Sequence, residues 1–167
     1  MLNIVLYAPR IPQNTGQIAR SCIAMNCRLH LVRPLGFRMD AASLKRSSVG
    51  YLEDMDIVIH DDINMFRDTA RYPSRTWLVS KYGYHPYDSV RFEEHDWLVF
   101  GNETEGLPAN WLEENPKQTL MIPMLNAETR CLNLSTAASV VMFEAIRQLR
   151  ASPGNKMHSM QTRKFVG

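Results

Sequence analysis

Strand-like and helix-like segments alternate along this 167-residue chain, and this alternation constrains its fold more than any other feature. Apolar runs predict strands at 2–7, 28–32, 56–59, 76–79, 97–100 and 119–122. Apolar residues at helical spacing predict helices at 14–26, 41–48, 64–71, 109–114 and 135–150. Because this rhythm places parallel strands beneath covering helices, we expect an α/β protein with a mostly parallel sheet flanked by helices.

The composition predicts one domain followed by a short tail. A hydrophobic content of 45% suffices for a single core over residues 1–150. Residues 151–167 carry Lys156, Arg163 and Lys164 among polar residues, so we expect a mobile, polar and basic tail. A solvated tail is favoured over one that contacts the phosphates of a nucleic acid.

Charge and hydropathy argue against several classes of protein. The net charge of +2 is far from that of a polybasic tail, so any nucleic-acid surface must be a local patch. No apolar run approaches the roughly 18 residues needed to cross a bilayer. The N-terminus lacks the basic region and cleavage site of a secretion signal. We therefore expect a cytoplasmic protein without a membrane partner.

The cysteines and histidines indicate no metal site. Cys22, Cys27 and Cys131 form no C-x-x-C pair, which argues against a disulfide scaffold or zinc ligation and favours reduced, mostly packed thiols. The histidines are scattered without metal-ligand spacing, so solvated or structural roles are expected for them.

A polar loop after the first strand contains a predicted helix start. Asn14 is expected to cap this helix, with Gln17 completing a capping box three residues later. Arg20 follows Gly16 by one helical turn, on the same face. Taken alone, Arg20 is better explained by an ordinary exposed ion pair on the helix surface.

The loop at 101–107 follows the predicted strand at 97–100, and its glycines, Gly101 and Gly106, allow a ligand to approach the main chain closely. Their spacing matches neither the dinucleotide fingerprint nor the phosphate loop, so nicotinamide and triphosphate sites are disfavoured. Glu103 and Glu105 make the loop acidic, which suits a positively charged ligand. An ordinary tight connection is the alternative.

A third polar loop, at 123–133, precedes the last helix. Asn133 or Ser135 can cap this helix, whose first amides would then point into a site, although a plain cap is the alternative. In a parallel sheet the loops that follow strands lie at one edge. The three loops are therefore expected to meet in one cleft.

The three loops, in this order, resemble the three motifs of the SpoU/TrmH branch of the SPOUT methyltransferases. The similarity rests on Asn14-Thr15-Gly16 with Arg20, on residues 101–107, and on Asn133-Leu134-Ser135. It covers about residues 1–150. The segments 2–7 and 11–16 and the step at 122–124 look like the small TrmL group, which methylates the ribose of the wobble nucleotide of tRNA.

The resemblance implies a homodimer, a trefoil knot in the C-terminal third of the domain, and S-adenosylmethionine bound through main-chain groups. It implies recognition of the anticodon stem-loop of tRNA without a metal. Catalytic positions carried over from the family are Asn14, Arg20, Glu103 and Asn133. Cofactor contacts carried over are Leu78, Val79, Gly101, Asn102, Gly106, Ile122, Cys131, Leu132 and Ser135.

The chain departs from the family pattern at positions that bear on the cofactor and the nucleotide. Cys131 stands where the family usually has serine, and a thiol is a weaker hydrogen-bond donor than a hydroxyl. Ala8 and Arg10 stand where TrmL-like proteins commonly carry acidic residues. The preference for cytidine or uridine is therefore left open.

The expected chemistry is in-line attack of a ribose 2′-hydroxyl oxygen on the sulfonium methyl group, which gains mainly from alignment of the reactants. A guanidinium keeps its proton in proteins, so we expect Arg20 to grip the adjacent phosphate and polarise the hydroxyl instead of serving as general base. Alternatives are 2′-O-methylation of ribosomal RNA or of another tRNA site, and a non-catalytic RNA-binding module.

Apolar residues on the last predicted helix give modest support for a dimer. They cover more than one narrow stripe, which indicates burial on more than one side, although packing within one monomer is the alternative. These residues are Ala137, Ala138, Val140, Val141, Phe143, Ala145, Ile146 and Leu149.

Overall fold

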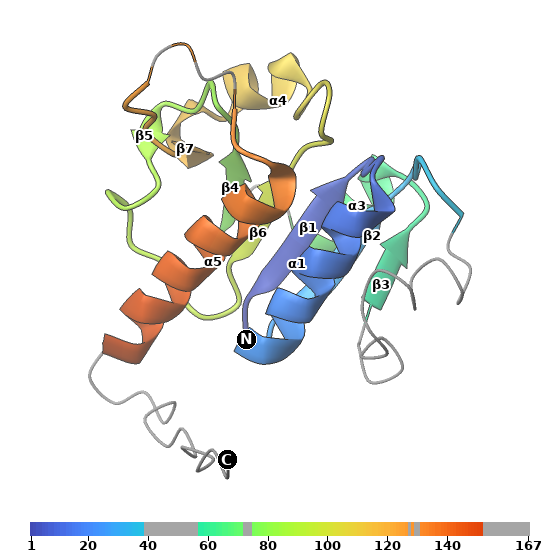
Figure 1. The fold of residues 1–167 in the computed structure, drawn as a ribbon, viewed down its shortest axis with the longest axis horizontal. Helices are drawn as coiled ribbons and strands as arrows, with labels where there is room; N and C mark the ends of the chain where they lie inside the picture. The colour runs from blue at the N-terminus through green and yellow to red at the C-terminus, as the bar shows by residue number, and fades with distance from the viewer. Residues whose placement is uncertain (39–56, 72–74, 127, 129–130, 152–167) are drawn as a thin grey trace, which may run out of the picture.

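A computed structural model describes residues 1–38, 57–71, 75–126, 128 and 131–151 of the chain. Its centre is a sheet in which every pair of neighbouring strands is parallel, in the order β3-β2-β1-β6-β4-β7-β5 (Figure 1). The strands are β1 (Asn3–Tyr7), β2 (Arg28–Val32), β3 (Ile57–His60), β4 (Thr76–Val79), β5 (His85–Pro86), β6 (Trp97–Phe100) and β7 (Thr119–Met121). This confirms the α/β class.

Helices cover both faces of the sheet. On one face, α1 (Pro12–Met25) packs against α5 (Leu134–Ala151), and the two helices run side by side in Figure 1. The other face carries α3 (Ile63–Ala70) and α4 (Ala109–Glu114), and a short 3-10 turn, η2 (Pro116–Gln118), precedes β7. Alternate residues of β1 serve the two faces: Ile4 and Leu6 join the core beneath α1 and α5, and Val5 joins the core beneath α3 and α4.

The predicted elements agree with the structure to within about two residues wherever both can be compared. The prediction missed β5 and η2, because two-residue and three-residue elements carry no periodic signal. The predicted helix at 41–48 and the tail beyond Ala151 lie outside the described residues. The trefoil knot stays a prediction, since parts of the segment that leads into α5 also lie outside them.

A buried carboxylate connects the amino ends of β4 and β6, at the end of the sheet away from the predicted cleft. Asp96, which is fully buried, accepts hydrogen bonds from Arg75 Nε and Nη2, both at 2.6 Å. It also accepts from the indole nitrogen of Trp77 at 2.9 Å and from the main-chain N–H of Glu93 at 3.0 Å. These bonds tie the loop before β6 to the start of β4.

Two histidines are buried against each other on adjacent strands. His30 Nδ1 lies 3.0 Å from His60 Nε2, and the rings stack with centroids 5.2 Å apart. His60 is 1% exposed, and burial lowers its pKa. Both histidines therefore have structural positions, as expected, and neither lies in the predicted cleft.

Candidate active site

A cavity of about 900 Å³ lies at the carboxyl ends of the strands. Its walls come from the segments that follow β1, β4, β6 and β7 and from the start of α5. In the sheet, β1 lies between β2 and β6. The chain passes from β1 to β2 on one side, and the later strands β6, β4, β7 and β5 lie on the other side, so the direction of winding changes between β1 and β6. Open α/β sheets bind ligands at such a point.

The loop after β6 is shaped by its own polar groups. Gly101 lies so close to the returning chain that a Cβ there would be 2.0 Å from the carbonyl carbon of Gly106 and 2.2 Å from the nitrogen of Leu107. Asn102 is buried, and its Oδ1 accepts from the main-chain N–H groups of Thr104 at 3.0 Å and Glu105 at 2.7 Å. The loop is therefore a tight, internally bonded turn.

Glu103 joins this loop to the start of α1. Its Oε1 accepts from the main-chain N–H of Ile11 at 3.1 Å and from Asn14 Nδ2 at 3.0 Å. Its Oε2 accepts from the main-chain N–H of Arg10 at 2.9 Å. The Arg10 guanidinium also contacts Glu105 at 2.9 Å. The basic residue that departs from the family pattern is thus paired with the acidic loop.

Asn133 joins α5 to the same group. Its Oδ1 accepts from the main-chain N–H of Ser135 at 2.8 Å, so Asn133 caps α5, as one of the two predicted candidates. Its Nδ2 donates to Asn14 Oδ1 at 3.0 Å. The amide of Asn14 therefore lies between Glu103 and Asn133 and links loops that are far apart in the sequence.

The predicted capping box at Asn14 and Gln17 is wrong. α1 begins at Pro12 after Ile11, and Asn14 lies within its first turn. Proline has no N–H, and the first position of a helix needs none, so Pro12 favours a helix start before Asn14. The Glu103 carboxylate binds the N–H of Ile11 from across the cleft. The Asn14 side chain is thereby left for Glu103 and Asn133, and the Gln17 side chain contacts the Ser135 hydroxyl at 2.5 Å.

Residues 1–143 match the family model described as SpoU rRNA Methylase family. The chain belongs to this family. A tRNA (cytidine(34)-2′-O)-methyltransferase of Yersinia pestis is 44% identical over 154 residues, which cover 89% of this chain and 94% of the relative. A solved structure that addresses 2-OH methylation of C/U34 on tRNA has a TM-score of 0.85 and 41% identity, and covers 91% of this chain and 98% of its own.

A third similarity concerns the cofactor. The SpoU methyltransferase AviRb of Streptomyces viridochromogenes, solved with AdoMet, has a TM-score of 0.77 and 27% identity. The match covers 91% of this chain and 59% of AviRb.

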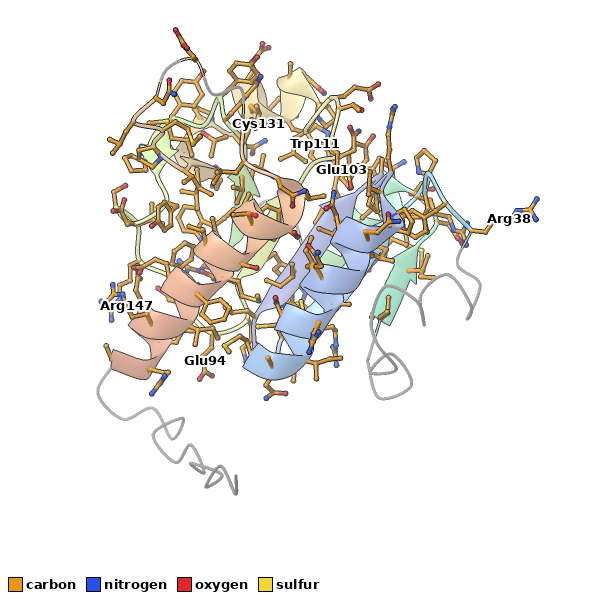
Figure 2. All side chains as sticks on the ribbon, viewed as in Figure 1. Arg38, Glu94, Glu103, Trp111, Cys131 and Arg147 are labelled. Carbon is orange, nitrogen blue, oxygen red and sulfur yellow. The ribbon has the colours of Figure 1, made fainter. Side chains whose placement is uncertain are left out.

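The structure of this SpoU family member brings most of the predicted site residues to one cavity. The following predicted residues line it: Asn14, Val79, Gly101, Asn102, Glu103, Gly106, Ile122, Cys131, Leu132 and Asn133. Figure 2 shows Glu103 and Cys131 at the end of the molecule where the strands end. Their catalytic and cofactor roles stay predictions.

Arg20, Leu78 and Ser135 are predicted site residues that do not line the cavity. Arg20 is exposed on α1, beyond the first turn that holds Asn14. Leu78 is fully buried in the core beneath α3 and α4, because its side chain points away from α1 and α5. Ser135 is buried behind Asn133 in the first turn of α5.

Sequence reasoning missed several cavity residues. Ser80, Lys81 and Tyr82 line it from the turn after β4. The signal was their position, since they follow a buried strand as the other loops do. The sequence does not predict this turn as part of a site, because it has no cluster of acidic or amide side chains.

The cysteines divide into two buried thiols and one exposed thiol. Cys22 on α1 and Cys27 just after it are buried in the core. Burial raises the pKa of both thiols, that of Cys27 to about 11, so both stay protonated. Cys131 is exposed and lines the cavity, so the thiols are mostly packed, as predicted, with Cys131 as the exception. Its place in a loop, outside any apolar repeat, explains the difference.

Among the described residues, no three His, Cys, Asp or Glu side chains come together as metal ligands. Within the same part of the chain, no helix combines the length and apolar character required to span a bilayer.

Proposed function

We propose that this protein methylates the 2′-hydroxyl of the wobble nucleotide of tRNA, a cytidine or uridine at position 34, with S-adenosylmethionine as methyl donor. The proposal is supported by the Yersinia pestis relative and by the C/U34 methylation structure, which each match nearly the whole of both chains. The observation that carries it is the bonded set of Glu103, Asn14 and Asn133, which joins the three family motifs at one cavity.

The cavity fits the methyl donor in size and charge. Sites for small molecules commonly measure about 300–1,000 Å³ and are lined mostly by apolar groups. Apolar side chains of Leu107, Leu112 and Ile122 are available for the adenosine part, and the carboxylates of Glu103 and Glu105 suit a cationic sulfonium. When bound, the donor supplies a methyl group that is open to nucleophilic attack.

The contribution of the protein is position. Glu103 accepts from main-chain and side-chain donors of the β1 loop, and Asn14 passes this connection to Asn133 at the start of α5. These bonds hold the cleft walls at a set separation, so the reacting groups need little reorganisation on binding. We assign Arg20 to the phosphate beside the target ribose and to polarising the 2′-hydroxyl, because a guanidinium makes paired hydrogen bonds to phosphate oxygens. Arg20 lies outside the cavity of its own chain, so this role requires that the target nucleotide reach α1 as well as the cavity.

We further propose that the enzyme is a homodimer that uses the outer faces of α1 and α5. Phe143 on α5 is 48% exposed and Ile23 on α1 is 36% exposed, and Val140 is partly exposed between buried positions of α5. Apolar side chains on neighbouring helices are commonly covered in an oligomer. Sedimentation of the pure protein tests this proposal. We also propose a cytoplasmic location, because the proposed substrate is tRNA.

The family model named for ribosomal RNA favours one alternative substrate, 2′-hydroxyls of ribosomal RNA. The deciding experiment incubates the protein with labelled S-adenosylmethionine and either total tRNA or ribosomal RNA, and then maps the modified nucleotide. Label at position 34 of tRNA is the expected result. Label only in ribosomal RNA would replace the tRNA proposal, and no label in either RNA would favour a binding module.

A further inference from the structure

Two tyrosine rings stand open to solvent on the turn after β4. Tyr82 is 70% exposed and Tyr84 is 61% exposed. We call residues 81–84 the tyrosine turn. Lys81 and Tyr82 line the cavity described above, so the turn forms part of its mouth.

The main chain of the tyrosine turn is held in place. Gly83 N–H donates to the Ser80 carbonyl at 3.0 Å, and Tyr84 N–H donates to Thr119 Oγ1 at 3.0 Å. A Cβ at Gly83 would lie 2.3 Å from the carbonyl carbon and oxygen of Leu120. The turn therefore lies directly against β7, and the exposed rings stand on a backbone that has little freedom to move.

A cation accompanies the first ring. Lys81 Nζ lies over the Tyr82 ring, 4.8 Å from its centroid. Aromatic rings next to a positive charge are the elements that proteins use to bind single-stranded nucleic acid, because bases stack on the rings and the cation binds the phosphates. Stacking tolerates any base, so it suits a position beside a target nucleotide.

We propose that the tyrosine turn is a stacking platform for the RNA: Tyr82 stacks on the base of a nucleotide next to the methylated one, Lys81 binds its phosphate, and Tyr84 supports a further base. This inference rests on the proposed function and names the contact that would hold the unpaired loop of the RNA. The alternative occupant is a second copy of the chain. RNA is favoured because Tyr82 borders the cavity and the Lys81 cation lies beside its ring.

The test compares Tyr82→Leu with Tyr82→Phe on an anticodon stem-loop RNA. Tyr82→Leu removes the ring, and Tyr82→Phe keeps it. Met65→Ala is the control, since Met65 is 48% exposed on α3 and does not line the cavity. We expect Tyr82→Leu to raise the Kd and KM for the RNA about tenfold, while KM for S-adenosylmethionine is unchanged. Tyr82→Phe and Met65→Ala should behave as wild type.

A second arm uses stem-loops that lack the base on one side of the target nucleotide. For wild type, we expect the Kd of one of these RNAs to be about tenfold higher than that of the intact stem-loop. For Tyr82→Leu, we expect the same two RNAs to have equal Kd values. Unchanged RNA affinity in Tyr82→Leu would refute the platform, even if methyl transfer by wild type is normal. Absence of methyl transfer by wild type would instead refute the proposed function. A changed oligomeric state with unchanged RNA affinity would assign the ring to a protein interface.

Discussion

Asn14 Nδ2 donates to Glu103 Oε1 at 3.0 Å, although 89 positions separate the two residues in the chain. The bond joins the first turn of α1 to the loop after β6. The same carboxylate accepts from the N–H groups of Arg10 and Ile11, so a side chain of one motif binds the main chain directly before the helix that carries another. The loop after β6 and the start of α1 therefore form one structural unit.

Glu103→Gln should destabilise this unit. Both carboxylate oxygens accept hydrogen bonds, and an amide would turn one of them into a donor that faces another donor. We expect the free energy of unfolding to fall by about 1–3 kcal/mol, measured by urea titration. Glu105→Gln is the matched control, because its exposed pair with Arg10 contributes at most about 1 kcal/mol. Equal effects of the two changes would contradict this role for Glu103.

Arg20→Lys should impair methyl transfer without affecting stability. Arg20 is exposed, and lysine cannot make the paired hydrogen bonds of a guanidinium to phosphate. We expect kcat to fall about a hundredfold while KM for S-adenosylmethionine is unchanged, in steady-state assays with tRNA. Arg147→Lys is the control, since Figure 2 shows Arg147 far from Glu103 and Cys131. Near-normal transfer by Arg20→Lys would refute the bidentate role.

Gly101→Ala should abolish cofactor binding. A methyl group at Gly101 would lie 2.0–2.4 Å from main-chain atoms of Gly106 and Leu107, so the loop would have to open. Titration calorimetry with S-adenosylmethionine should show no binding. Gly106→Ala is the comparison with a smaller effect. No atom lies within 4 Å of the added methyl group, but an alanine at the Gly106 φ of +73° costs about 1 kcal/mol of backbone strain. Full binding by Gly101→Ala would show that the loop is not tightly packed.

Asp96→Ala should destabilise the fold without changing the chemistry. The substitution leaves Arg75, Trp77 and the N–H of Glu93 without their shared acceptor. Because Arg75 is partly exposed and can turn to water, we expect a loss of about 2–3 kcal/mol in urea titrations. Glu93→Ala, which removes a longer, exposed contact to Arg75 at 3.5 Å, should change stability by less than about 1 kcal/mol.

Stability should fall in mild acid because of His60. Burial lowers its pKa in the folded state, so the unfolded chain binds the proton first as the pH falls. The contribution of His60 to the free energy of unfolding is therefore fully present above about pH 6.5. Below this pH the free energy of unfolding decreases, by up to about 1.4 kcal/mol per pH unit, until the pH reaches the folded-state pKa. Urea titrations of wild type and His60→Gln between pH 8 and pH 5 measure this, and an equal decrease in both would exclude His60 as the cause.

The sequence by itself determined the α/β class, the mostly parallel sheet and the three polar loops at the strand ends, because hydrophobic periodicity and loop position after a strand are local properties. The same local rules left Asn133 and Ser135 as candidate caps of α5, and the structure identifies Asn133 as the cap.

Only the tertiary structure decided which partners these loops use. Three features depend on residues about 90 to 120 positions away. They are the start of α1 at Pro12, the position of Asn14 between Glu103 and Asn133, and the pairing of Arg10 with Glu105. The same holds for Leu78, which turns into the core, and for the tyrosine turn, which borders the cavity because it packs on β7. Contacts between distant segments are set by strand order, and local patterns carry no record of that order.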